Sequence, residues 1–144
     1  MKKVSNLIYT KGNSITVVET TTPVYEALEI MVSKNMGALI VFKEGEYAGL
    51  FTERDYARKV ILKGKNSHDT VVGDIMQENA ATVSFNDSIE TCMEIMSDKH
   101  IRYLPVLSEG HVVGIVSMGD LVRFIIDDQK HTIQHLQNFI SGSV

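Results

Sequence analysis

The 144-residue chain has few of the features that mark secreted, membrane-bound or nucleic-acid-binding proteins. Cys92 is its single cysteine, so no intramolecular disulfide can form and zinc sites built from several thiolates are excluded. No run approaches the roughly 18 apolar residues of a membrane span, and the N-terminus lacks the apolar core of a signal peptide. Lysine and arginine number 14 against 18 aspartates and glutamates, and this net charge of −4 argues against DNA or RNA as a partner. We therefore expect a cytoplasmic protein with no membrane and no nucleic-acid partner.

What the chain does contain is an ordinary globular composition with a duplication inside it. Hydrophobic residues make up 44% and charged residues 22%, which is enough for a packed core of about one domain. Residues 24–62 align without a gap with residues 89–127 at a constant offset of 65, with 12 identities in 39 positions. Two copies of one structural unit are the simplest explanation.

Each copy has the pattern of a β-α-β-β-α unit. Apolar residues recur with helical spacing in 24–31 and again in 89–96. Short apolar runs separated by Glu-Gly turns predict a hairpin in each copy, formed by 38–42 with 47–52 and by 104–107 with 112–117. One further strand is predicted before each helix, at 15–18 and 81–85. We predict an α+β fold whose two units, each too small to be stable alone, pack sheet against sheet.

Three segments follow from this pattern. Residues 1–65 form the first repeat with its lead-in, 66–128 the connector and second repeat, and 129–144 a C-terminal helical tail. In the tail, Ile133, Leu136 and Ile140 share one helical face. We expect this helix to dock on the body of the protein or on a second subunit.

The most informative motif occurs once in each copy, in residues 49–55 and 114–120. Both segments read glycine, two apolar residues, a hydroxyl residue, two variable residues and aspartate. A hydroxyl followed three residues later by Asp is an N-terminal helix-capping pattern. Alternatively, the hydroxyl and the helix N–H groups receive a phosphate, while the carboxylate accepts hydrogen bonds from two ribose hydroxyls. The two interpretations are compatible.

With these motifs the chain resembles a tandem pair of CBS domains, also called a Bateman module. The matching pieces are Leu7-Ile8, Ile75-Met76, Leu104-Pro105-Val106 and both glycine-to-aspartate motifs. The run 52–60 with Lys63-Gly64-Lys65 resembles the stand-alone two-repeat CBS proteins of bacteria and plant organelles. The resemblance implies pseudo-twofold packing of the repeats and two clefts for adenosine-containing ligands such as AMP, ADP, ATP, NAD(H) or S-adenosylmethionine.

The resemblance also implies which residues form the two clefts. The first cleft would consist of Leu50, Thr52, Arg54, Asp55, Thr82, Val83, Ile101, Arg102 and Tyr103. The second would consist of Ile15, Thr16, Met36, Gly37, Ala38, Ile115, Ser117, Gly119 and Asp120. The aspartates would hold ribose, Thr52 and Ser117 would face phosphate, and the apolar residues would enclose adenine.

The two clefts differ in charge. Arg54 and Arg102 can form charge-assisted bonds to phosphate in the first cleft, whereas glycines stand at the aligned positions of the second. We therefore expect phosphate-rich ligands to prefer the first cleft. In the alternative interpretation, Arg102 forms a surface ion pair of little energetic consequence.

The favoured function is a non-catalytic regulatory module. We expect it to require no cofactor, to bind an adenine nucleotide (AMP, ADP, ATP or NAD(H)) as its regulatory ligand, to form a homodimer and to signal to an unidentified partner protein. A ligand-independent dimerisation or docking module remains an alternative. A nucleotide-processing enzyme is less favoured, because the sequence has no P-loop, dinucleotide fingerprint or nucleophile-base pair, so no catalytic residue is assigned. His131 and His135 lack a third ligand, so no metal site is predicted.

Overall fold

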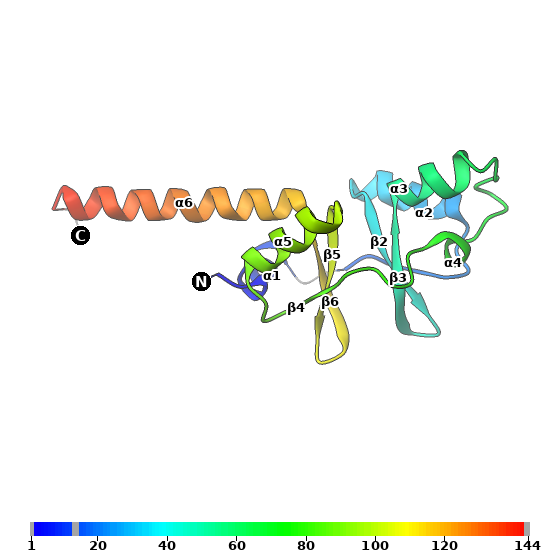
Figure 1. Cartoon of the computed structure of the whole chain (residues 1–144), viewed down its shortest axis with the longest axis horizontal. Coiled ribbons are helices and arrows are strands. Elements are labelled where there is room, and N and C mark those ends of the chain that lie inside the picture. Colours follow the sequence, from blue (N-terminus) through cyan, green and yellow to red (C-terminus); the bar gives the residue numbers. More distant parts are fainter. Residues whose placement is uncertain (1, 13–14, 143–144) are drawn as a thin grey trace.

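The computed structural model describes residues 2–12 and 15–142, and it shows two similar units side by side, each built on a three-stranded sheet (Figure 1). The first unit contains β1 (Val17–Glu19), α2 (Val24–Lys34), β2 (Ala38–Lys43), β3 (Glu46–Thr52), α3 (Glu53–Tyr56) and the π-helical turn η1 (Ala57–Ile61). The second contains β4 (Val83–Ser84), α5 (Ile89–Lys99), β5 (Tyr103–Ser108), β6 (His111–Ser117) and α6 (Met118–Ile140). The predicted α+β fold with two β-α-β-β-α repeats is confirmed.

The two sheets share their topology and their irregularities. In each, the first strand runs parallel to the second, which pairs antiparallel with the third. A register shift falls between Val41 and Phe42 in the first sheet and at the aligned position in the second. Both hairpins turn on a Glu-Gly pair with positive φ at both residues, 52° and 82° for Glu44-Gly45, which is the geometry of a type I′ turn. The sequence duplication is therefore also a duplication of local geometry.

Among the described residues, the hydrophobic core has three parts. Each repeat packs its helices on its own sheet, with Phe51 and Leu104 fully buried at the respective centres. A third cluster joins the two sheets and includes Ala38, Leu50 and Ile115. The predicted packing of the two sheets against each other is therefore present.

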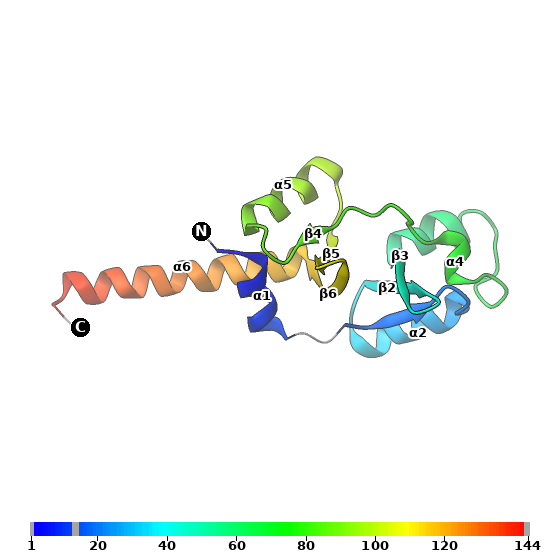
Figure 2. The same ribbon diagram turned by 90° about the horizontal axis from the view of Figure 1, so that it is seen from below.

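Two short helices connect the repeats crosswise (Figure 2). They are α1 (Val4–Lys11), which precedes the first repeat, and α4 (Val72–Ile75), which precedes the second. The backbone N–H of Val4 donates to the carbonyl of Asp87 in the second repeat, and that of Val72 donates to the carbonyl of Thr22 in the first, both at 2.8 Å. Val4, Leu7 and Ile8 accordingly belong to the core of the second repeat, and Val72 and Ile75 to that of the first. Each lead-in thus completes the core of the other repeat.

Helix α6 extends well beyond the body of the protein (Figure 1). It is continuous over 23 residues, so the predicted tail boundary at residue 129 falls inside it. No glycine or proline lies between Asp120 and Ile140 to end the helix earlier. The side chains of Ile133, Leu136 and Ile140 are 55%, 53% and 83% exposed, so this stretch does not dock on the body. Among the described residues, no helix is both long and apolar enough to cross a membrane.

Candidate functional site

The two glycine-to-aspartate motifs form helix caps. Thr52 caps α3: its hydroxyl accepts from the N–H of Asp55 at 3.2 Å, and its own N–H donates to Asp55 Oδ2 at 2.9 Å. Ser117 and Asp120 repeat this reciprocal pair at the start of α6, with distances of 3.0 and 2.9 Å. The capping interpretation is confirmed, and it fixes one carboxylate at each junction between strand and helix.

A cavity of about 530 Å³ lies beside the first of these junctions and has walls from both repeats. Its volume is within the usual range of small-molecule sites, roughly 300–1,000 Å³. The largely apolar part of the wall consists of Gly37, Leu50, Ala80, Ala81, Ile101 and Tyr103. The polar part consists of Thr52, Glu53, Arg54, Gln77, Asn79, Lys99 and Arg102. An apolar pocket with a few convergent polar groups is the usual form of a ligand site.

Most residues assigned to the first cleft lie on this wall. Leu50, Thr52, Arg54, Ile101, Arg102 and Tyr103 line the cavity. Asp55 is buried behind the wall, with 4% of its surface exposed, and hydrogen-bonds to Thr52. Val83 is buried in the core of the second repeat, and the half-buried Thr82 does not line the cavity.

Gly37 was expected in the second cleft and lines the first. A Cβ added at this position would lie 2.2 Å from the hydroxyl of Tyr103 and 2.7 Å from Glu53 Oε1. Only a residue without a side chain therefore allows Tyr103 to approach the backbone here. Burial, and next the negative charge of Glu53, raise the pKa of the Tyr103 hydroxyl, so it stays a hydrogen-bond donor at neutral pH.

The polar wall has an excess of positive charge. Arg54, Lys99 and Arg102 stand against a single acidic lining residue, Glu53. Arg54 donates from Nη1 to the backbone carbonyl of His100 at 3.0 Å, which connects the two repeats across the cavity. Within the described part of the chain, neither Lys99 nor Arg102 forms an ion pair, so the surface pair considered for Arg102 is not formed there. These cations suit an anionic ligand.

Gln77 connects the cavity wall to the buried carboxylate, a role that neither of the repeated motifs predicts. Its side-chain amide donates to both oxygens of Asp55 at 3.1 Å, while its backbone forms two hydrogen bonds with Leu50, of 2.8 and 3.1 Å. Lys59 lies 3.3 Å from the same carboxylate. The carboxylate of Asp55 is thus satisfied within the chain by a neutral amide on the cavity side and an ammonium behind it.

The residues assigned to the second cleft lie in several different surroundings. Ala38 and Ile115 are buried where the two sheets meet, and Met36 packs on the core of the first repeat. The half-buried Ile15 and Thr16 precede β1, Gly119 lies beside Arg123, and Ser117 caps α6. A second hollow of about 620 Å³ lies between α1 and α6, and Asp120 is the one member of the predicted set on its wall.

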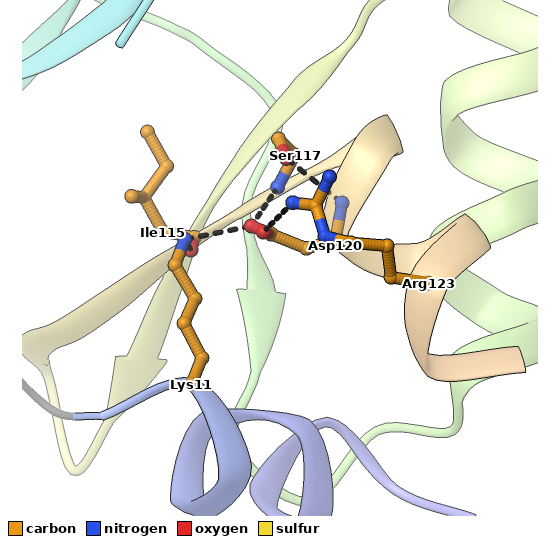
Figure 3. A network of polar contacts seen from close by, with 5 residues as sticks. All are labelled: Lys11, Ile115, Ser117, Asp120 and Arg123. Atoms are coloured by element: carbon orange, nitrogen blue, oxygen red, sulfur yellow. Dashed lines mark hydrogen bonds and ion pairs between the residues drawn. The ribbon is translucent and has the colours of Figure 1, made fainter. Parts of the chain in front are cut away.

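Asp120 is held by two cations of the chain itself (Figure 3). The ammonium of Lys11 lies 2.6 Å from Asp120 Oδ2 and also donates to the carbonyl of Ile115 at 2.8 Å. Arg123 donates from Nη2 to Asp120 Oδ1 at 2.9 Å. Burial raises the pKa of the Asp120 carboxyl, but hydrogen bonds from Lys11 and Ser117 and the charge of Lys11 outweigh it. The pKa therefore lies below its ordinary value, and the group is a carboxylate at neutral pH.

Comparisons with known proteins agree with this architecture. The sequence profile of the CBS domain matches residues 4–62 and 72–127. The mitochondrial CBS domain-containing protein CBSX3 of Arabidopsis thaliana is 41% identical over 83% of this chain, which spans only 60% of that protein. CBS domain-containing protein YhcV of Bacillus subtilis is 32% identical over 77% of this chain and 81% of its own length. A solved structure of a CBS-domain protein from Burkholderia ambifaria superimposes with a TM-score of 0.85 at 38% identity, covering 89% of this chain and 96% of that one. The chain therefore belongs to the CBS-domain family, as a tandem pair of CBS repeats.

Proposed function

We propose that the chain is a non-catalytic sensor that binds an adenine nucleotide, AMP, ADP, ATP or NAD(H), in the cavity of the first cleft. CBS pairs are regulatory modules that typically bind nucleotides. The observation that carries the proposal for this chain is the cavity between the repeats. Its wall combines an apolar part with the cations Arg54, Lys99 and Arg102, and it lies beside the helix cap that Thr52 and Asp55 form. Each part of a nucleotide has a chemically matched surface there.

The proposed arrangement follows from the order of side chains around the cavity. Adenine packs against Leu50, Ile101 and the ring of Tyr103, which provide the apolar part of the wall. Phosphate lies toward Lys99 and Arg102, whose positive charges have no acidic partner among the described residues. Ribose lies toward Asp55, and its hydroxyls replace the amide of Gln77 on the carboxylate, while Thr52 faces phosphate. The remaining members of the predicted first cleft, Thr82 and Val83, act by supporting the wall next to Ala81.

The proposed signal is a change in the relative placement of the two repeats. The ligand contacts both repeats at once, so it shifts their arrangement only by its difference in affinity for the two states. A homodimer partner or an unidentified regulated protein then reads that arrangement. The cytoplasmic location stays a prediction, and the mitochondrial relative adds the mitochondrion as a second compartment to test.

Isothermal titration calorimetry of the whole chain with AMP, ATP, NADH and S-adenosylmethionine tests the proposal. We expect at least one adenine nucleotide to bind, and Arg102→Ala to weaken it about tenfold or more, the effect of losing one charge-assisted hydrogen bond. Arg58→Ala is the matched control, because Arg58 is exposed on η1 and does not line the cavity. Absence of binding by all four compounds, or equal losses in both variants, contradicts the proposal. Turnover of bound AMP that Asp55→Asn abolishes favours the enzyme alternative instead.

A ligand-independent docking or dimerisation module is the second candidate. The observation that favours it is the exposed apolar face of α6, where Ile133, Leu136, Phe139 and Ile140 are all more than half exposed. An exposed apolar face of this kind is a common feature of protein–protein contact sites. Self-association that is the same with and without saturating AMP supports this candidate over sensing.

A further inference from the structure

The two aspartates at the ends of the repeated motif are each contacted by a residue from the opposite lead-in. Gln77 follows α4 and reaches Asp55 in the first repeat. Lys11 ends α1 and reaches Asp120 in the second repeat. Matching Leu7-Ile8 with Ile75-Met76 places Gln77 opposite Tyr9 and not opposite Lys11. The two residues therefore reach equivalent carboxylates from different positions of equivalent lead-ins.

Both residues contact the aligned carbonyl and the aligned carboxylate, but with different groups. The backbone N–H of Gln77 donates to the carbonyl of Leu50 at 2.8 Å, and its side-chain amide donates to the carboxylate of Asp55 at 3.1 Å. Lys11 donates to the carbonyl of Ile115, which aligns with Leu50, at 2.8 Å, and to the carboxylate of Asp120 at 2.6 Å. The carboxylate of Asp55 therefore meets a neutral amide, whereas that of Asp120 meets the ammonium group drawn in Figure 3.

The difference decides which carboxylate a ribose can reach. Ribose hydroxyls are neutral donors, so they can replace the amide of Gln77 with hydrogen bonds of the same kind. The ammonium of Lys11 forms a shorter, charge-assisted contact, and Arg123 holds the other oxygen of Asp120 from the opposite side. Neutral hydroxyls that displaced Lys11 would break an ion pair whose carboxylate side chain is only 12% exposed.

We propose that Lys11 is an internal occupant of the second cleft, so that an adenine nucleotide binds the first cleft alone and one ligand binds per chain. The inference rests on the proposed function, because it concerns the same kind of ligand. Lys11 is thereby the residue that determines how many sites the tandem repeat offers. The duplicated motif is intact in both copies, but in the second it binds the chain's own lysine.

Counting AMP molecules bound per chain, by equilibrium dialysis and calorimetry, tests the inference. Wild type binds one, and Lys11→Gln, which copies the residue of the first cleft, binds two. Lys11→Arg keeps the cation and binds one. Lys43→Gln is the matched control, because it removes one positive charge from an exposed residue that lines neither the cavity of the first cleft nor the hollow beside Asp120, and it too binds one.

The reciprocal variant gives a second test that does not depend on the stability of the Lys11 variants. Gln77→Lys places an ammonium beside Asp55 and lowers AMP affinity about tenfold or more, the effect of one charge-assisted contact. A Lys11→Gln variant that folds and binds one AMP, a wild type that binds two, or a Gln77→Lys variant with unchanged or higher affinity overturns the inference while the proposed function stands. Where wild type binds ATP or NADH rather than AMP, the same counts apply to that nucleotide. A wild type that binds none of AMP, ATP, NADH and S-adenosylmethionine refutes the proposed function, and the inference with it.

Discussion

Gly49 and Gly114 occupy equivalent positions in β3 and β6, but what lies opposite each of them differs. A Cβ at residue 49 would lie 2.4 Å from the backbone carbonyl oxygen of Gln77 and 3.3 Å from Met76 Sδ. A Cβ at residue 114 would lie 2.7 Å from Cδ1 of Ile8, the end of a flexible side chain. Gly49→Ala therefore forces two backbone segments apart, whereas Gly114→Ala requires only a new rotamer of Ile8.

The expected loss of stability follows from the contacts at each position. Separating β3 from Gln77 removes the two backbone hydrogen bonds with Leu50 and loosens the amide contact to Asp55. At about 1 kcal/mol per hydrogen bond these losses cost about 2–3 kcal/mol, and alanine gains about 0.5–1 kcal/mol over glycine in a strand, so Gly49→Ala lowers the free energy of unfolding by about 1–2.5 kcal/mol. For Gly114→Ala, an off-rotamer Ile8 costs about 0.5–1.5 kcal/mol, and alanine gains about 0.5–1 kcal/mol over glycine in a strand, so the change is near neutral.

Urea unfolding followed by far-UV circular dichroism measures both variants against wild type, since the chain has no tryptophan to report by fluorescence. An equal slope of the free energy of unfolding against urea concentration (the m value) in all three proteins shows that their folded and unfolded states are equally compact and can be compared. The reasoning is refuted if the two variants lose the same stability, or if Gly114→Ala loses more.

Three further experiments test other parts of the molecule. Because the pKa of Asp120 is lower in the folded than in the unfolded chain, its carboxylate stabilises the fold above about pH 4, and this contribution disappears as the pH falls through the folded value. Asp120→Asn is thus less stable than wild type at pH 7 but approaches it in acid, and a difference in urea midpoint that stays constant down to pH 3 contradicts this. Burial, and next the charge of Asp87, raise the pKa of the Cys92 thiol to about 11, so a disulfide reagent at pH 8 should label it only as the protein unfolds; rapid labelling of the folded protein would disprove burial. If α6 holds a homodimer, Ile133→Lys and Leu136→Lys should shift sedimentation from dimer to monomer, and dimers that persist in both variants argue against this face.

The repeat in the sequence made most of the fold predictable. The offset of 65 identified both hairpins, both helices and the strand-to-helix junctions, since each copy supports the other. The boundary of the tail could not be predicted. The apolar positions predicted its helix, but no glycine or proline between Asp120 and Ile140 marks where one helix ends and another begins. Whether Ile133 and Leu136 pack on the body of the protein depends on contacts with residues distant in the sequence, and helical periodicity does not predict such contacts.

The candidate site was predictable where its residues lie in the repeated motif, and not elsewhere. Lys99 lines the cavity but lies outside the glycine-to-aspartate motifs, and its identity with Lys34 did not mark it as a site residue. Gln77 and Lys11 lie in the lead-ins, outside the segment that the offset aligns. Their partners are set by the crosswise placement of α1 and α4, which is a property of the assembled chain rather than of any local pattern.

The crosswise helices also set an order of events during synthesis. Helix α1 precedes every other element of the structure, yet Val4 bonds to Asp87, so its apolar face stays uncovered until the second repeat has been made. Contacts between such distant positions form slowly, and uncovered apolar surface invites association with other chains in the meantime. The first repeat receives α4 soon after its own strands and closes early. Deleting α1 from the N-terminus should therefore destabilise the second repeat, which is translated last, because Val4, Leu7 and Ile8 belong to its core.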